Sequence, residues 1–427
     1  MIHLDMENGR GSSLKGNLGI GIVVCILVLS LMFVFSCEIV SASPASAPEY
    51  SQSEQAYLIS NLEELNYIRE DLDNDYVLID DVDASSVQSW DNGRGWEPIG
   101  SKNDPFNGDF KGNGYEIKDI YIDRSQSEYI GLFGVVGNKG KVSDITLVDV
   151  EFSGSRNVGG LVGYLKGEVS QASVSGFVNG STNVGGVVGY NLSNLNNSSS
   201  SANIEGGRMS TGGLVGFNAN GSIVKMSYAI GSVKGKLSVG GLVGYNGQPD
   251  SDSEKARISS SYAMGDVVGN SEVGGLVGTN FSNIEISYAR GDVEGGKYVG
   301  GLVGGVSPYA SVDESYSTGR VYGENKVGGF TGYKNFKSEV TDSYWDEDAS
   351  MITDSQGGVG LDNVSMKGRS ARDTMEGFDF NDTWDVVDGR YPVLSSLKES
   401  SGSGSDTGSV TDYVSYYISN LSLLLIF

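Results

Sequence analysis

The chain has 427 residues, and 54 acidic against 29 basic side chains give it a formal net charge of −25. Its two cysteines and one histidine, Cys25, Cys37 and His3, all lie within the first 37 residues, in or beside an apolar run. If that run is a targeting segment, the remaining protein lacks both residue types, which excludes disulfide frameworks, Cys/His zinc sites and histidine-dependent nucleophiles. The acidic balance also argues against nucleic acid as a partner, because no basic patch offsets repulsion from phosphates.

The first segment, residues 1–47, is predicted to be a signal peptide or an N-terminal anchor. Leu18 to Phe35 is free of charge, Arg10 and Lys15 precede it, and small residues follow it. A basic flank, an apolar core and a small-residue exit are typical of a secretory signal, although this core is long enough to approach a membrane span. A lipid on Cys37 is a third interpretation. All three place the protein outside the cell or at the cell surface.

Residues 48–128 are expected to cap the N-terminal end of the fold. Apolar residues at 58, 59, 62, 65 and 68 have helical spacing, so we predict an amphipathic helix over Ser53–Arg69. Val77 to Val82 is predicted to be the first strand. Asp71, Asp73 and Asp75 resemble the start of a calcium-binding EF-hand loop, but the required Gly and Glu positions are absent.

Residues 129–350 contain a repeated glycine phrase. The steps from each Gly-x-x-Gly to the next are 29, 26, 27, 28, 34, 26 and 28 residues, and the longest step carries a polar insert at 248–255. The eight copies start at Gly131-Leu-Phe-Gly134, continue with Val158-Gly-Gly-Leu-Val-Gly-Tyr164 and end at Val327-Gly-Gly-Phe-Thr-Gly-Tyr333. A fixed period of this length indicates a solenoid or a propeller.

The alternatives to a β-solenoid fit poorly. Propeller blades need about 40 residues, and leucine-rich repeats need several leucines in each unit. Helices would lose roughly 1 kcal/mol for each Gly relative to Ala. We therefore predict an all-β fold, a right-handed parallel β-helix (solenoid) of about eight 26–29-residue coils, with an N-terminal amphipathic capping helix.

A second phrase, Ser-Tyr-Ala-x-Gly-x-Val, alternates with the first. The charged residues occupy the positions that alternate with Ser, Ala, Gly and Val, and Tyr is one of these positions. Side-chain alternation therefore places the tyrosines on the outer face, one above another. We predict a binding row that could stack on sugar rings; the alternative is that stacked rings only stabilise consecutive coils. The row consists of Tyr228, Tyr262, Tyr288, Tyr316 and Tyr344.

Asp266 and Asp292 occupy equivalent positions of adjacent coils, about 5 Å apart by strand spacing. Such a carboxylate pair could serve glycosyl transfer or bind Ca²⁺. Apart from this Ca²⁺ candidate, we expect no metal and no cofactor. With no cleft evident in the sequence and Arg320 next in the row, solvated carboxylates are the simpler interpretation.

Asparagines follow the glycine phrase at Asn191, Asn218, Asn246 and Asn280. Asn tolerates a left-handed turn, and stacked amides can form hydrogen bonds from coil to coil. Several Asn-x-Ser/Thr sequons are candidate glycosylation sites in an exported protein. We name Asn196, Asn197, Asn191, Asn220 and Asn280, with the first two as the best candidates.

The C-terminal part divides into three segments. Residues 351–398 are expected to close the C-terminal end of the solenoid, because a terminal coil without a cap is an open sheet edge. Residues 399–412 form a Ser/Gly linker. Residues 413–427 form an apolar tail, either an anchor or sorting signal or merely a frayed end.

The two phrases together resemble the repeats of GLUG-motif proteins, which are named for a Gly-Leu-x-Gly core. The flanks are similar as well: Trp96-Glu-Pro-Ile-Gly100 upstream, and Asp342-Ser-Tyr-Trp-Asp346 and Gly389-Arg-Tyr-Pro392 downstream. The resemblance covers about residues 58–394 and implies an exported or surface β-solenoid. It implies no reaction, because peptidases that carry this repeat use a zinc His-Glu-x-x-His motif that this chain lacks.

We therefore expect a non-catalytic structural or adhesive module that is secreted or displayed at the cell surface. Its expected partner is a cell-envelope polysaccharide or other glycan, or a surface protein, with membrane contact only through the terminal apolar segments. The alternative is a polysaccharide lyase or hydrolase that works with carboxylates and Ca²⁺.

Overall fold

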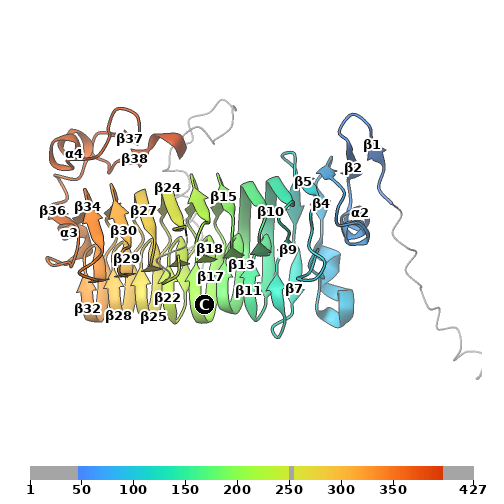
Figure 1. Ribbon diagram of the computed structural model, residues 1–427, viewed down its shortest axis with the longest axis horizontal. Helices are drawn as coiled ribbons and strands as arrows, with labels where there is room; N and C mark the ends of the chain where they lie inside the picture. Colours follow the sequence, from blue (N-terminus) through green and yellow to red (C-terminus); the bar gives the residue numbers. More distant parts are fainter. Residues whose placement is uncertain (1–46, 250–253, 398–427) are drawn as a thin grey trace, which may run out of the picture. The chain divides into compact units, whose positions relative to one another are not determined.

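The computed structural model describes residues 47–249 and 254–397, and strands dominate these residues (Figure 1). Strands of successive coils pair in parallel, which confirms the predicted all-β parallel solenoid. The signal or anchor expected before residue 47, the linker at 399–412 and the tail at 413–427 lie outside the described residues. Within the described residues, no helix has both the length and the apolar character needed to cross a membrane.

One sheet of the solenoid contains eight strands, one for each copy of the glycine phrase. Residues at equivalent positions of the repeat pair from coil to coil, as in Val243 with Val277 and Asn246 with Asn280. This register confirms the expected number of about eight coils. The strands are β9 (Phe133–Val136), β12 (Val162–Leu165), β14 (Val188–Asn191), β18 (Val215–Asn218), β23 (Val243–Asn246), β26 (Val277–Asn280), β29 (Val303–Val306) and β33 (Thr331–Lys334).

The other faces of the coils form a continuous 28-stranded sheet. Its parallel pairing extends upstream of residue 129, since β5, β6 and β7 pair with β10. Its strands are β1 (Tyr50–Ser51), β2 (Ala56–Ile59), β3 (Tyr76–Leu78), β4 (Val82–Asp83), β5 (Asp109–Lys111), β6 (Glu116–Lys118), β7 (Tyr121–Asp123), β8 (Glu128–Ile130), β10 (Lys141–Ser153), β11 (Arg156–Gly159), β13 (Glu168–Gly185), β15 (Asn194–Asn196), β16 (Ser199–Ser200), β17 (Asn203–Gly212), β19 (Ile223–Lys225), β20 (Tyr228–Ala229), β21 (Val233–Lys234), β22 (Leu237–Gly240), β24 (Arg257–Ala263), β25 (Val267–Gly274), β27 (Asn283–Ala289), β28 (Val293–Gly300), β30 (Ser311–Asp313), β31 (Tyr316–Ser317), β32 (Val321–Gly328), β34 (Glu339–Thr341), β35 (Tyr344–Asp346) and β36 (Val359–Leu361).

The core runs inside the coils and is built from the apolar residues of the two repeated phrases. Val239, Leu242 and Val243 of one glycine phrase are fully buried, as is Ala263 of a Ser-Tyr-Ala phrase. Burying each Val or Leu side chain stabilises the fold by about 1.5–3 kcal/mol. Because each coil contributes the same set, the core is continuous from coil to coil.

The last glycine of the glycine phrase lies so close to the backbone of the neighbouring coil that no side chain fits there. A Cβ at Gly304 would lie 2.5 Å from the backbone nitrogen of Val273 on the neighbouring coil. The next residue, Gly305, has only the Cγ of Glu272 near its Cβ position, at 3.9 Å. A side chain is therefore excluded at Gly304 but not at Gly305.

Each coil turns at a residue in the left-handed backbone conformation, just before the Val-Gly-Gly or Thr-Gly-Gly of its phrase. The φ angles of these residues lie between 54° and 58°, although none of them is glycine. Asn and Ser tolerate this conformation, whereas it is costly for Tyr and Lys. The turn residues are Asn157, Asn183, Ser210, Ser238, Glu272, Tyr298 and Lys326.

The predicted helix over Ser53–Arg69 is wrong in its first half. Residues 56–59 form β2, which pairs in parallel with β3, and helix α2 spans only Leu62–Tyr67 before the 3₁₀ turn η1 (Ile68–Glu70). Asn61 ends the extended segment because its side chain accepts a hydrogen bond from the Glu64 backbone, while the Glu64 carboxylate accepts one from Ser60. The expected buried face is correct, since Leu65 and Ile68 are fully buried.

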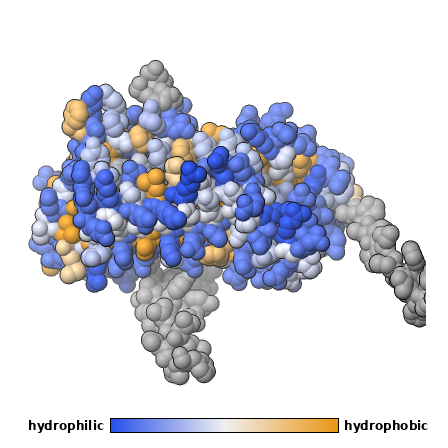
Figure 2. Space-filling view, turned by 90° about the horizontal axis from the view of Figure 1, so that it is seen from below, coloured by the Kyte–Doolittle hydropathy of each residue, from blue (hydrophilic) through white to orange (hydrophobic). Residues whose placement is uncertain are grey.

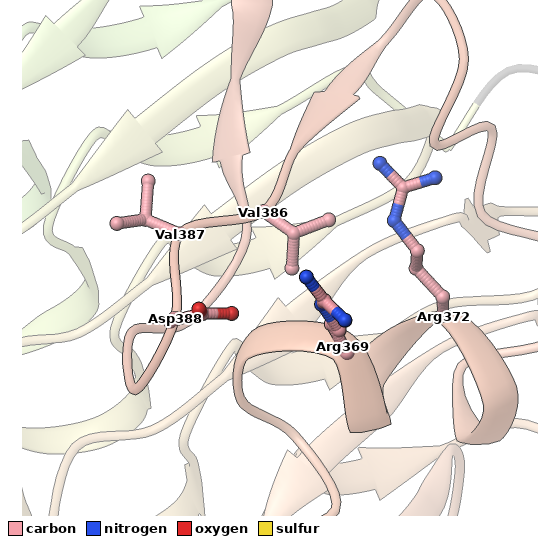
Figure 3. A pocket seen from close by; sticks show the side chains of 5 residues that line it. All are labelled: Arg369, Arg372, Val386, Val387 and Asp388. Carbon is pink, nitrogen blue, oxygen red and sulfur yellow. The ribbon is translucent and has the colours of Figure 1, made fainter.

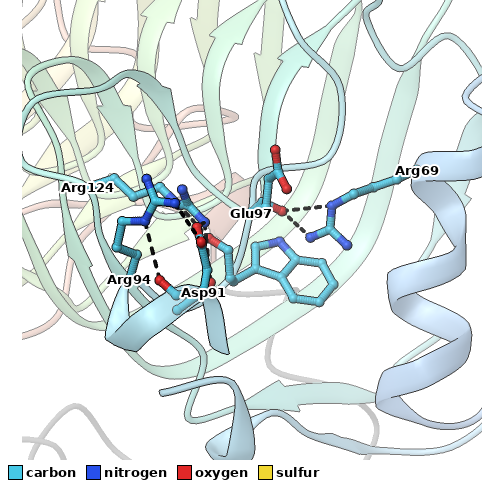
Figure 4. A network of polar contacts seen from close by, with 7 residues as sticks. Arg69, Asp91, Arg94, Glu97 and Arg124 are labelled. Carbon is cyan, nitrogen blue, oxygen red and sulfur yellow. Dashed lines mark hydrogen bonds and ion pairs between the residues drawn. The ribbon is translucent and has the colours of Figure 1, made fainter. Parts of the chain in front are cut away.

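Arginine side chains tie η1 and the 3₁₀ segment η2 (Ser85–Gly93) to the neighbouring segments around Trp96 and Arg124 (Figure 4). The Arg69 guanidinium lies 4.0 Å from the ring centre of Trp96 and donates to the carbonyl oxygen of Glu97. Arg124 donates to the Asp91 carboxylate over 2.7 Å. Burial lowers the pKa of Arg69 to about 10. These contacts fix the N-terminal cap on the solenoid.

The segment after residue 346 follows two different paths. Helix α3 (Glu347–Ser350) and β36 continue from the last coil, and β36 pairs with β35. In contrast, α4 (Gly368–Thr374), the antiparallel pair β37 (Trp384–Asp385) and β38 (Val393–Leu394), and η3 (Ser395–Leu397) lie along the side of the last coils (Figure 1). Residues 361–397, called here the C-terminal cover, therefore pack against a lateral face, which the sequence did not predict.

Candidate functional site

The tyrosines of the second phrase form a stack along the solenoid, called here the first aromatic ladder. Successive ring centres are 4.9 Å apart from Tyr228 to Tyr262, 4.8 Å to Tyr288 and 5.0 Å to Tyr316. The ring planes differ by only 4° to 8°. Tyr344 continues the row by pairing with Tyr316 in the parallel register. The predicted vertical row is thus confirmed.

The expectation that all five rings face water is wrong for three of them. Tyr288 is 2% exposed, Tyr316 is fully buried and Tyr344 is 6% exposed. Tyr228 and Tyr262 are half-buried. Side-chain alternation correctly placed the rings outside the coil, but it could not reveal that a distant segment covers them.

The C-terminal cover buries the ladder with its own aromatic residues. Trp384 lies 5.7 Å from Tyr316 and stacks on Phe378 at 4.7 Å between ring centres. The Tyr316 hydroxyl donates to the carbonyl oxygen of Pro392, and the Tyr344 hydroxyl donates to that of Glu376. Burial raises the pKa of Tyr316 to about 12.

The stacking itself limits what the ladder can bind. Each inner ring presents both faces to neighbouring rings, so only its edge and hydroxyl point outward. A sugar ring stacks on an aromatic face, and within the ladder these faces are already occupied. Each stacked pair contributes about 0.5–1.5 kcal/mol to the stacking of coils. This geometry favours the structural interpretation of the row.

A second aromatic ladder was missed in the sequence. Its rings occupy the position after the last glycine of the glycine phrase, and Phe281 continues it after Thr279 interrupts the pattern. Ring centres lie 4.8 to 5.4 Å apart along Tyr164, Tyr190, Phe217, Tyr245 and Phe281. All five are half-buried, and burial raises the pKa of Tyr245 to about 12. The signal was present, since four of the rings recur at one position of the repeat.

The asparagines after the glycine phrase form a buried amide ladder. Each side chain donates to the next carbonyl oxygen, over 2.8 Å from Asn191 to Asn218, 2.9 Å to Asn246 and 2.8 Å to Asn280. All four are fully buried. The predicted hydrogen bonding is confirmed, but none of the four has the left-handed backbone that was expected.

This ladder corrects two of the glycosylation candidates. Asn191 and Asn280 are inaccessible, because their amides are buried and hydrogen-bonded within the stack. Asn220 is half-buried, and its side chain accepts a hydrogen bond from the Gln248 backbone. Asn196 and Asn197 are half-buried at a turn on the outer surface and remain candidates.

The carboxylates of Asp266 and Asp292 are exposed and bridge consecutive coils. Asp266 accepts a hydrogen bond of 3.0 Å from the Asp292 backbone, and Asp292 accepts one of 2.9 Å from the Arg320 backbone. Asn203 accepts the backbone N–H of Ser232 in the same way at an equivalent position. In the part of the chain that the structure describes, no group of three or more His, Cys, Asp or Glu side chains is arranged to hold a metal ion.

A shallow groove lies on the outer face of the last coils and was not predicted. Its floor is formed by glycines of β25 and β28, and Tyr322 of β32 rises at one side with 65% of its surface exposed. Apart from Val268, the remaining lining residues are polar or charged. The lining residues are Val268, Gly269, Asn270, Glu294, Gly295, Gly296, Lys297, Tyr322, Glu324 and Asn325.

A second hollow lies on the C-terminal cover. Arg369 and Arg372 of α4 face the loop after β37, which contributes Val386, Val387 and Asp388 (Figure 3). Elsewhere, the face seen in Figure 2 is largely hydrophilic, with small and separate hydrophobic patches. The groove at Tyr322 is thus the better candidate for ligand contact, because an exposed aromatic ring there adjoins polar groups.

The GLUG motif matches residues 207–234 and 295–322, and each range contains one complete glycine phrase and nearly all of the Ser-Tyr phrase that follows it. This chain carries GLUG-motif repeats. The match agrees with the resemblance seen in the sequence, and the GLUG repeats correspond to single coils of the solenoid.

Two similar proteins share part of the chain. Halomucin of Haloquadratum walsbyi is 35% identical over 127 residues, which is 29% of this chain and 1% of halomucin. A protein of Evansella cellulosilytica named as a Gly-rich membrane protein is 37% identical over 127 residues, which is 28% of this chain and 14% of that protein. The chain therefore aligns with only a small part of either relative.

Two solved structures are similar at low identity. A crystal structure from Bacteroides ovatus, described as an immunoglobulin A1 protease, has a TM-score of 0.42 at 17% identity over 82% of this chain and 94% of that chain. A structure named IgA1 protease has a TM-score of 0.43 at 15% identity over 84% of this chain and 26% of that chain.

Proposed function

We propose that this GLUG-repeat chain is a non-catalytic structural or adhesive module at the cell surface or in the extracellular space. The proposal rests on one observation, namely that the repeated residues make contacts between consecutive coils. The Asn ladder and both aromatic ladders join coil to coil, so the repeat builds a rod-like scaffold whose outer face repeats with every coil. Such a face suits many shallow contacts with a repeating polymer or a surface protein.

The similar proteins support the proposed location. One is named as a Gly-rich membrane protein and is 37% identical over 127 residues. We extend this membrane association to the present chain, together with its expected N-terminal export segment, as a location at the cell surface. The partner we propose is a cell-envelope polysaccharide or another surface glycan or protein.

The competing function is a polysaccharide lyase or hydrolase that uses Asp266, Asp292 and Ca²⁺. The two carboxylates lie on an exposed face, and each accepts a backbone hydrogen bond from the next coil. Because the two carboxylates accept hydrogen bonds that bridge consecutive coils, a structural role is favoured over a role as catalytic acid, catalytic base or metal ligand. We therefore place the enzyme second.

Localisation tests the proposal most directly. Protease treatment of intact cells, followed by fractionation and mass spectrometry of the mature N-terminus, is expected to find the repeats outside the cell. Retention of the chain in the cytoplasm would contradict the proposal.

Turnover separates the two functions. The purified full chain, incubated with a polysaccharide panel with and without Ca²⁺, is expected to release no reducing ends and no unsaturated products. Product formation that disappears in Asp292→Ala would establish the enzyme instead.

A further inference from the structure

The groove at Tyr322 is hollow because one side chain is missing from an outward row. Parallel pairing aligns Asn270, Gly296 and Glu324 in three consecutive coils. Asn270 and Glu324 project their side chains into solvent, and Gly296 between them has none. The notch therefore spans two strand spacings, roughly 9.6 Å, which admits one sugar ring.

The ring of Tyr322 stands apart from both aromatic ladders. It is 65% exposed, and no other ring or cation of the described residues lies against it. Val268, on the same outward row two coils away, is 41% exposed. Because Glu294 lies between them in the register, the row supplies an aromatic face, a carboxylate and an apolar contact in sequence.

The polar groups beside the notch favour an uncharged ligand rich in hydroxyl groups. Glu294 and Glu324 are exposed and form no ion pair among the described residues, so their oxygens are available as acceptors. Lys297 also lines the groove, but its ammonium lies 4.4 Å from the ring centre of Tyr298 and pairs with neither carboxylate. Two carboxylates beside a single ammonium disfavour an anionic polymer and accept hydrogen bonds from hydroxyl groups.

We propose that the notch between Asn270 and Glu324, flanked by Tyr322, binds one sugar unit of a neutral glycan. The ring of Tyr322 stacks on the sugar, while the two glutamates and the Asn270 amide bind its hydroxyl groups. This inference rests on the proposed adhesive function and narrows its partner to a neutral polysaccharide.

The test is calorimetric titration of the purified full chain with cellohexaose, chitohexaose and polygalacturonate. We expect binding of at least one neutral hexasaccharide and none of polygalacturonate. Tyr322→Ala is expected to weaken binding by at least roughly tenfold, which corresponds to about 1.4 kcal/mol. Tyr322→Phe keeps the ring and is expected to bind like the wild type. Phe336→Ala removes an even more exposed ring, 86% against 65%, outside the groove and serves as the control.

Three outcomes would overturn the groove assignment: no binding of either neutral hexasaccharide, preferred binding of polygalacturonate, or unchanged affinity in Tyr322→Ala. A parallel pull-down on insoluble cell envelope separates this assignment from the adhesive function. Envelope binding that persists in Tyr322→Ala would refute the groove and leave the adhesive function standing. If the wild-type chain does not bind the envelope, the adhesive function itself is refuted.

Discussion

The guanidinium of Arg290 donates a hydrogen bond of 2.7 Å to the carbonyl oxygen of Pro392, 102 residues further along the chain. The same guanidinium lies 4.6 Å from the ring centre of Tyr288 and donates to the hydroxyl of Tyr316. Arg290 thus joins the first aromatic ladder to the C-terminal cover. The cover is bound to the side of the solenoid by specific polar contacts as well as by apolar packing.

Replacing Arg290 is expected to loosen the cover without unfolding the repeats. Arg290→Met removes the hydrogen bonds to Tyr316 and Pro392, and each hydrogen bond to a charged group contributes about 1.5–3 kcal/mol. We expect faster hydrogen exchange in residues 361–397, with exchange in β14 to β23 unchanged. Arg320→Met, at an exposed position one coil further on, is the control. Equal protection of the cover in both variants would contradict this role.

Removing Trp384 is expected to release the cover more completely. Trp384 is 1% exposed, stacks on Phe378, and donates over 2.8 Å to the carboxylate of Glu314. Truncating a buried Trp to Ala costs about 3–5 kcal/mol. We expect limited proteolysis of Trp384→Ala to cut within residues 361–397 and leave the coils intact, because each coil is stabilised mainly by its neighbours. Cleavage throughout the repeats would show that the cover supports the whole solenoid.

Alkaline pH is expected to open the same interface. Burial raises the pKa of Tyr316 to about 12, and it also raises that of Tyr288 far above the ordinary tyrosine value of about 10. The stability gained from these protonated hydroxyls is complete below pH of about 10 and is lost as the pH rises through about 12. Tyrosinate absorbance during a pH titration measures this directly. In Trp384→Ala the buried tyrosines are expected to titrate nearer 10; an unchanged titration would contradict the proposed burial.

Two adjacent glycines, Gly304 and Gly305, allow a matched test of how closely the coils pack. Gly304→Ala places a Cβ 2.5 Å from the Val273 backbone nitrogen, and backbone atoms cannot move aside without shifting the coil. Gly305→Ala has only one atom near its Cβ position, at 3.9 Å. We expect urea denaturation to show a loss of about 1–3 kcal/mol for the first variant, as for other overpacked sites, and little change for the second. Equal stabilities would refute the close-approach explanation.

The buried amide ladder is expected to be sensitive to the loss of one member. Asn246→Leu leaves the donor of Asn218 and the acceptor of Asn280 without their ladder partner. Each unsatisfied buried group costs about 1–3 kcal/mol, so the unfolding midpoint is expected to fall clearly. Asn325→Leu changes an exposed asparagine of a later coil and serves as the control. A stable Asn246→Leu variant would mean that the ladder contributes little.

Much of this protein was determined by its sequence because the repeat period is also the structural period. Residues that recur at a nearly constant spacing lie above one another in adjacent coils. The stacked tyrosines and the hydrogen-bonded asparagines could therefore be named from the sequence alone. The recurrence of the phrase Val-Gly-Gly-Leu-Val-Gly likewise predicted about eight coils, and each copy supplies one strand of the eight-stranded sheet. The start of α2 was misplaced because helical spacing of apolar residues outweighed the Asn61 cap signal.

Only the tertiary structure decided which of these rows is exposed. Tyr288, Tyr316 and Tyr344 have the same local sequence pattern as Tyr228, yet they are buried by a distant segment. Tyr344 contacts Glu376, 32 positions later, and Tyr316 contacts Pro392, 76 positions later. Alternation along a strand reports which side of the coil a residue lies on, and it carries no information about a distant segment that docks there. The notch at Gly296 likewise arises from three coils together, since one absent side chain becomes a groove only when its neighbours above and below project.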